Sequence, residues 1–322
     1  MAGGKERALR RRIRSIQSTK KITKAMELIA ASRIAKAQQR VAAARPYSER
    51  ITEVIRNLAA AGAGEGSPLL AERDRVETVA YVVVAGDRGL SGAYNSSVIR
   101  AAERSMLHQR EQGRRTRLVT VGKKAQSYFR FRGWEIDEAY VGISDNPSYE
   151  DARIIADYVT TRFEQGEYDR VELAYTQFLS VGTQRVTIRR FVPLDASLLE
   201  TGDGPTADYE FEPAPQQILD RLLPRYAEAR LYAALLEGAA SFFAAQQRAM
   251  KSATDNAEEL IVKYSREMNR ARQDAITTEI MEIVGGAEAM RQAQSDRTDL
   301  LVDHVLMAAD VLTNELNPLS RS

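Results

Sequence analysis

The sequence has no cysteine and only two histidines, His108 and His304, in 322 residues. Without cysteine the chain can form no disulfide, no thiolate nucleophile and no cysteine-ligated metal site. The two histidines stand alone, which argues against a histidine-based metal cluster. No apolar run approaches the roughly 18 residues of a membrane-spanning helix, and no apolar stretch follows the basic N-terminus as it would in a secretory signal. We therefore expect a cytoplasmic protein that does not cross a membrane.

The sequence also has little net charge, because 46 basic and 44 acidic residues leave a balance of +2. The segment before Met26 is the exception, since one acid, Glu6, stands there among nine basic residues. They are Lys5, Arg7, Arg10, Arg11, Arg12, Arg14, Lys20, Lys21 and Lys24. Such a cluster is a solvated helix face, or it binds nucleic acid or an acidic protein. No aromatic residue is interleaved with these charges, so base stacking is poorly supported.

Proline and glycine are scarce in residues 1–60 and 216–290, which predicts two long helices. Each stretch carries a seam spaced by three and four residues, as in a coiled coil. The predicted first seam is Leu9, Ile13, Ile16, Ile22, Met26, Ile29, Ile34, Ala37, Val41, Ala44, Ser48, Ile51, Ile55 and Leu58. The second is Leu231, Leu235, Gly238, Phe242, Ala245, Ala249, Ser252 and Asn256, then, after a phase slip, Leu260, Tyr264, Met268, Ala271, Ala275 and Thr278. Pro46 should kink the first helix without ending it. We expect the two helices to pack antiparallel.

Between linkers near residues 62–68 and 200–215, strands and helices alternate. Apolar and β-branched runs predict strands at 79–85, 118–121, 134–141, 171–179 and 184–193. Amphipathic patterns predict helices ending near 112, over 123–131 and over 149–165. This alternation predicts an α/β domain over residues 76–195 with a mostly parallel sheet and an antiparallel edge. The predicted fold class is therefore α/β with long flanking helices.

Three glycines, Gly86, Gly89 and Gly92, follow the first predicted strand. A glycine-rich turn between a strand and a helix binds phosphates in many α/β folds. The spacing here matches neither the dinucleotide fingerprint nor a P-loop, so we favour a tight turn over a nucleotide site. No nucleophile is paired with a histidine, and carboxylates follow helical ion-pair spacing, as in Glu259 and Lys263. The sequence predicts no catalytic residue, cofactor or metal.

Four segments carry a more specific signal: Ser18–Gln38, Asp87–Asn95, Leu222–Leu260 and Asn269–Ala289. At these places, and in this order, the chain resembles the γ subunit family of F-type ATP synthases. The resemblance covers nearly all of residues 1–290. It implies a central stalk, the rotor of a rotary motor, in which an antiparallel coiled coil flanks a Rossmann-like α/β domain. It also implies a non-catalytic subunit that transmits rotation between the membrane c-ring and the α3β3 ring, coupling proton transport to ATP synthesis or hydrolysis.

The resemblance extends to individual residues. It implies contact with the α/β ring for Lys20, Lys21, Thr23, Lys24, Met26, Glu27, Arg272, Gln273, Ile276, Thr277, Ile280, Ile283 and Val284. It implies a rotor-foot contact with the ε subunit and the c-ring for Asp87, Arg88, Gly89, Leu90, Gly92 and Asn95. Met26 should be a packing residue at the coupling point. The implied location is peripheral, on the cytoplasmic side of a bacterial plasma membrane.

An alternative of another class is a free-standing nucleotide-binding or nucleic-acid-binding protein with coiled-coil arms. Behaviour in isolation separates the two, because a shaft subunit should depend on partners and turn over no ATP. Residues 291–322 depart from the family, whose members usually end near residue 290. We expect this extension to be a short amphipathic helix ending before Pro318, or a mobile tail.

Overall fold

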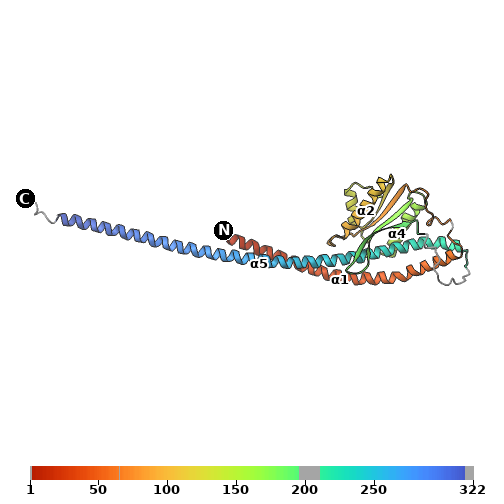
Figure 1. The fold of residues 1–322 in the computed structure, drawn as a ribbon. Coiled ribbons are helices and arrows are strands. Elements are labelled where there is room, and N and C mark those ends of the chain that lie inside the picture. The colour runs from red at the N-terminus through yellow and green to blue at the C-terminus, as the bar shows by residue number, and fades with distance from the viewer. Residues whose placement is uncertain (1, 65, 196–210, 316–322) are drawn as a thin grey trace, which may run out of the picture. The chain divides into compact units, whose positions relative to one another are not determined.

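The computed structural model describes residues 2–64, 66–195 and 211–315, with side chains over 4–64, 66–195, 211–292 and at 294 (Figure 1). The chain divides into two compact units. One, here called the globular unit, is Lys21–Asp255, and the other, the terminal unit, combines Met1–Lys20 with Asn256–Ser322. Two long helices, α1 (Ala2–Ala60) and α5 (Pro215–Glu315), each contribute to both units. Pro46 lies inside α1, so this proline does not end the helix.

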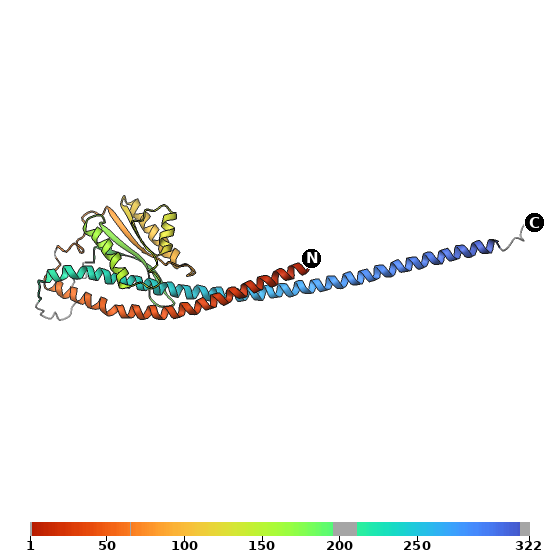
Figure 2. The same cartoon turned by 180° about the vertical axis from the view of Figure 1, so that it is seen from behind.

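The globular unit contains a five-stranded sheet with the order β3-β2-β1-β4-β5 (Figures 1 and 2). Its strands are β1 (Thr78–Val84), β2 (Arg115–Val121), β3 (Glu138–Tyr140), β4 (Arg170–Phe178) and β5 (Gln184–Val192). The β1–β2, β1–β4 and β2–β3 pairs are parallel, and β4–β5 is antiparallel. The predicted parallel sheet with an antiparallel edge is confirmed, although β3 is shorter than the predicted strand 134–141.

Helices cover both faces of this sheet. On one face, α2 (Tyr94–Glu111) and α3 (Lys123–Phe131) bury Val98, Met106 and Phe129 against β1 and β2. On the other face, α4 (Tyr149–Glu164) joins the end of α1 and the start of α5 in a second apolar cluster. Every residue of β1 is buried, because this central strand has helices on both sides. A β-branched run of this kind is what a strand buried on both faces requires.

The two long helices run antiparallel within each unit. In the terminal unit, Arg12 lies over the ring of Tyr264 at 4.7 Å, and Lys20 pairs with Glu258 at 3.2 Å. In the globular unit, Thr23 Oγ1 is 2.7 Å from Thr254 Oγ1. As the residue number rises along α1, the number of the contacting residue on α5 therefore falls. This confirms the predicted antiparallel coiled coil.

The seam of α1 differs from our prediction between residues 16 and 30. We assigned Ile22 and Ile29 to it, but they are 58% and 53% exposed, whereas Thr23 and Ala30 are buried. The three-and-four spacing in fact continues without interruption through Lys20, Thr23 and Glu27. The prediction was wrong because it followed apolar residue type, while the helix keeps its period through a polar segment.

The seam of α5 also changes phase earlier than we predicted. Gln246, Met250, Thr254 and Ala257 are buried, whereas the predicted seam positions Ser252, Asn256 and Leu260 are exposed. The buried residues of α5 are thus spaced by four and again by four up to Thr254. After Thr254 the spacing alternates between three and four residues. The phase slip that we placed after Asn256 is absent there.

The C-terminal boundary of α5 differs as well. We expected the long helix over 216–290 and a separate short helix or mobile tail over 291–322. Instead, α5 continues through Glu315 as one helix. The pair Gly285–Gly286 lowers helix propensity but does not forbid the helical backbone, and no proline occurs between Gly286 and Pro318. Residues 316–322 lie outside the described part of the chain.

The buried hydroxyl pair between the two helices gives a first testable prediction. Replacing Thr23 or Thr254 alone with valine should destabilise the chain by about 1 kcal/mol, because the hydrogen bond between the two hydroxyls across the seam is lost. The double variant should cost less than the sum, because both positions are then apolar and of unchanged shape. Urea unfolding of the four chains of this cycle measures the coupling. Additive losses would show that the two hydroxyls do not interact.

Candidate functional site

The loop after β1 is organised by the carboxylate of Asp87. Its two oxygens accept hydrogen bonds from the backbone amides of Lys123 (2.9 Å), Gly142 (2.9 Å) and Ser144 (3.0 Å), and from Ser144 Oγ (2.7 Å). Burial alone would raise the pKa of Asp87, but these donors lower it below its usual value. Asp87 therefore joins the segments that follow β1, β2 and β3.

Asn95 and Phe242 fix the rest of this loop. Asn95 Oδ1 accepts from the amide of Gly86 at 2.7 Å, and its Nδ2 donates to the carbonyl of Arg88 at 2.9 Å. The ring of Phe242 in α5 packs so closely on Gly86 that an added Cβ would lie 3.1 Å from it. The phosphates of a dinucleotide would need this approach to the glycine backbone, so the nucleotide interpretation of the loop loses support.

The tip of the loop is exposed. Leu90 is 62% exposed and has φ +63°, the one positive φ at a non-glycine position in the described ranges. Gly92 has φ +57°, which glycine adopts without strain. Arg88 Nε lies 3.3 Å from Asp145 Oδ2. Of the predicted foot residues, Asp87 and Asn95 thus hold the loop from inside, whereas Arg88 and Leu90 face solvent.

On α1, the predicted ring-contact residues of the globular unit lie on different sides of the helix. Thr23 is buried, Met26 and Glu27 are partly buried, and Lys21 and Lys24 are exposed. Lys24 Nζ pairs with Glu27 at 3.1 Å. Sequence reasoning missed three exposed apolar side chains beside them: Ile22, Leu28 and Ile29. Their exposure can be recognised only once it is known which face of α1 packs against α5.

In the terminal unit, Lys20 is partly exposed and the predicted residues of α5 are all exposed. They are Arg272, Gln273, Ile276, Thr277, Ile280, Ile283 and Val284. The apolar members are exposed to an unusual degree, reaching 71% at Ile283. From Arg272 to Arg291 only Ala275 is partly covered. Contiguous exposed apolar side chains on a soluble chain mark an interaction surface.

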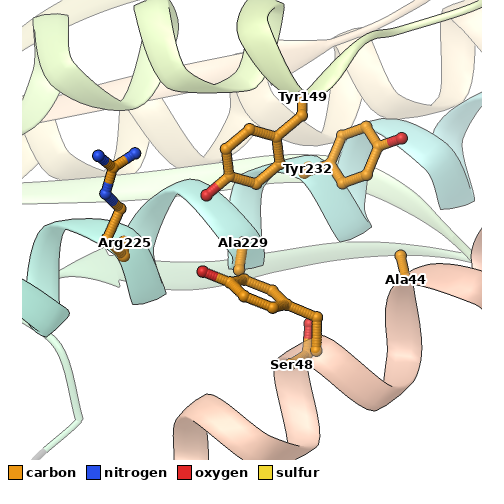
Figure 3. A pocket seen from close by; sticks show the side chains of 7 residues that line it. Ala44, Ser48, Tyr149, Arg225, Ala229 and Tyr232 are labelled. Atoms are coloured by element: carbon orange, nitrogen blue, oxygen red, sulfur yellow. The ribbon is translucent and has the colours of Figure 1, made fainter.

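An aromatic pocket of about 450 Å³ lies between α1, α4 and α5 in the globular unit (Figure 3). The rings of Tyr149 and Tyr232 meet edge to face with centroids 5.6 Å apart. Tyr149 Oη donates to Glu228 Oε2 at 2.8 Å, and Arg225 pairs with the same oxygen at 3.2 Å. Burial, together with this hydrogen bond, raises the pKa of Tyr149. The Glu228 carboxylate is thus already paired within the chain, and these three side chains hold α4 to α5.

Among the described residues, no group of three or more histidine, aspartate or glutamate side chains is placed to hold a metal ion. None of the described helices is long and apolar enough to cross a bilayer.

Comparison with known proteins identifies the family. The sequence model described as ATP synthase matches residues 5–290. The ATP synthase gamma chain of Parafrankia sp. (strain EAN1pec) is 52% identical over 296 residues, covering 89% of this chain and 98% of the relative. That of Acidothermus cellulolyticus is 48% identical with the same coverage. A chain of the Euglena gracilis mitochondrial ATP synthase (OSCP/F1/c-ring) shares the fold, with a TM-score of 0.62 at 18% identity over 91% of this chain and 96% of that one. The chain belongs to the ATP synthase gamma chain family.

Proposed function

We propose that this chain is the central-stalk rotor that transmits rotation between the membrane c-ring and the α3β3 catalytic ring of an F1Fo ATP synthase. It couples proton flow to ATP synthesis or hydrolysis and contributes no catalytic group of its own. The observation that carries the proposal is the exposed face of α5 over 272–291, a helix surface rich in apolar side chains that the terminal unit leaves uncovered. A shaft seated in a sleeve requires such a surface.

The ring contact, in this proposal, uses two kinds of side chain. One is apolar and forms a contact surface that makes few directional bonds. Its members are Ile276, Ile280, Ile283 and Val284. Basic side chains attract acidic loops of the partner subunits, and this long-range attraction persists as the rotor turns. They are Lys20, Lys21 and Lys24 on α1 and Arg272 on α5. Coupling then arises because each rotor angle favours a different set of conformations in the ring. Thr23, Met26, Glu27, Gln273 and Thr277 complete the proposed contact set.

The foot of the rotor, in this proposal, is the loop held by Asp87 and Asn95. This loop contacts the ε subunit and the c-ring through Arg88, Gly89, Leu90 and Gly92. The backbone strain and exposure of Leu90 support this assignment, because residues held in sparsely populated backbone regions often serve function. In this proposal the chain is peripheral to the bilayer and lies on the cytoplasmic side of a bacterial plasma membrane.

Met26→Lys tests the proposed coupling point. In the assembled complex, a charge added at this partly buried position beside Lys24 should lower the number of protons pumped per ATP by about fivefold, the equivalent of roughly 1 kcal/mol of coupling. ATP hydrolysis itself should change little, because its residues lie on other subunits. Ala43→Lys is the matched control, since it adds the same charge at an exposed position of α1 outside the proposed contact. Equal coupling in the two variants would refute the role of Met26.

A further inference from the structure

The uncovered part of α5 in the terminal unit carries an apolar seam of its own. From Ile276 onward, apolar side chains recur at alternating steps of four and three residues, as in a coiled coil. The seam consists of Ile276, Ile280, Ile283, Ala287 and Met290, and all five are exposed. Exposure reaches 71% at Ile283 and 74% at Met290. Helices in water are stabilised mainly by packing of their apolar face, so this seam calls for a partner helix.

This seam does not continue the face of α5 that packs on α1. That face includes the buried Ala271 and the partly buried Ala275, and the same spacing would carry it to Thr278 and Glu282. The exposed seam starts one residue after Ala275, at Ile276, and therefore points in a different direction around the helix. A helix packed on the exposed seam would lie beside α1 and not in line with it.

The spacing of the exposed seam is symmetric about Gly285. Ile280 and Met290 lie equally far from this glycine along the helix, and so do Ile283 and Ala287. In an antiparallel pair of α5 helices from two copies, Ile280 of each copy would therefore face Met290 of the other. Ile283 would face Ala287, so that a large side chain meets a small one, as close packing requires. The seam is thus complementary to itself.

The residues beside the seam also suit this pairing. A Cβ added at Gly285 or Gly286 would meet no atom within 4 Å, so the two backbones are free to approach closely at the symmetry axis. In an antiparallel coiled coil, the residues flanking the seam meet their counterparts across the interface. These pairs are Val284 with Val284, Gly286 with Gly286, Thr277 with Arg291 and Glu279 with Ala293. None of them brings two like charges together.

We propose that the free chain forms an antiparallel dimer through residues 276–294 of α5, so that a second copy of the chain covers the exposed seam. The same side chains belong to the proposed ring contact, and the dimer and the assembled rotor therefore exclude each other. The dimer keeps the apolar surface out of water until the ring replaces the second copy. The dimer depends on α5 alone, whereas its replacement by the ring rests on the proposed function.

Disulfide trapping tests the geometry, because the chain has no cysteine of its own. In the antiparallel pair, a double variant with Ile280→Cys and Met290→Cys places a thiol of each copy opposite a thiol of the other. Oxidation should give a disulfide-linked dimer, since a disulfide needs Cα atoms within about 7 Å. Within one helix the two positions are about 15 Å apart, so the bond cannot form inside a single chain.

The two single cysteine variants are the controls for this experiment. In the antiparallel pair neither cysteine meets its own counterpart, so neither single variant should give a covalent dimer on a denaturing gel. A parallel pair would link both single variants instead. Equal yields from the single and double variants, or no covalent dimer from the double variant, would overturn the proposal.

Sedimentation velocity of the full-length chain measures the strength of association. The wild type should sediment as a dimer at micromolar concentration. Ile283→Lys should raise the dissociation constant about a hundredfold or more, because it brings a charge from each copy into the seam beside the axis. Met281→Lys is the matched control, since Met281 is 69% exposed on the same stretch of α5 but lies outside the seam. Equal association of the two variants would refute the dimer.

Addition of the isolated α3β3 ring distinguishes the dimer from the rotor function. The ring should dissolve the wild-type dimer and take up one copy of the chain. A wild-type chain that is monomeric by itself but binds the ring would overturn the dimer alone. A dimer that persists unchanged in excess ring would overturn the proposed ring contact and leave the dimer in place.

Discussion

Gly122→Ala should abolish stable folding of the globular unit or lower its stability by more than about 4 kcal/mol, the range reserved for severe core lesions. Gly122 follows β2 with φ +94°, and a Cβ there would lie 2.2 Å from the carbonyl oxygen of Ala85 and 2.7 Å from its carbonyl carbon. Both atoms are backbone, so no rotamer change relieves the clash. Moving Ala85 would displace the end of β1 and the loop that begins at Gly86.

Gly113→Ala is the control for backbone conformation alone. Gly113 has φ +79°, but no atom lies within 4 Å of an added Cβ. This variant should cost only the strain of a left-handed backbone, about 1–2 kcal/mol. Thermal unfolding followed by circular dichroism compares the two chains, and the yield of soluble protein serves if Gly122→Ala does not fold. Melting temperatures within a few degrees of each other would contradict the clash argument.

Asp87→Ala should cost about 3 kcal/mol or more, because it leaves three backbone amides and the Ser144 hydroxyl without their acceptor. Asp87→Asn should cost less, since one oxygen still accepts hydrogen bonds although the charge is lost. The loop that carries Arg88 and Leu90 would lose its attachment, so the proposed foot contact should weaken in parallel. Urea unfolding at pH 7 and binding of the ε subunit measure the two effects separately.

The stability that Asp87 contributes should also depend on pH. Its folded pKa lies below the unfolded value of about 4, so the contribution is fully present above pH 4 and disappears as the pH falls through the folded pKa. The difference in stability between the wild type and Asp87→Asn should therefore shrink on acidification below pH 4. A difference that stays constant down to pH 2 would show that the charge of Asp87 is not the stabilising element.

Much of the fold followed from sequence patterns. The β-branched run that became β1, the strand–helix alternation and the antiparallel helices were all predictable, because burial on two faces and a 3.5-residue repeat leave strong local signals. Ile22 and Ile29 were misplaced because residue type and helical phase disagree there, and phase is decided by the partner helix. No local signal distinguishes an apolar residue that packs inside the chain from one that faces a partner.

The candidate sites were predictable to different degrees. The exposed residues from Arg272 to Val284 could be named only through family resemblance, since nothing in their composition sets them apart. The role of Asp87 was invisible, because its donors Lys123, Gly142 and Ser144 come from distant parts of the sequence. Gly122 looked like any other glycine, because the carbonyl that it approaches, that of Ala85, lies just after β1, far from Gly122 in the sequence.

The hydroxyl pair of Thr23 and Thr254 has a consequence for the synthesis of the chain, because its members are separated by 231 residues. A ribosome adds about 5–20 residues per second, so α1 emerges roughly 10–50 s before the part of α5 that covers its seam. During that interval the nascent helix must stay soluble without its partner. The nine basic residues before Met26 and the polar seam positions Lys20, Thr23 and Glu27 keep it hydrated. The polar stretch of the seam thus keeps the unfinished helix soluble until α5 covers it.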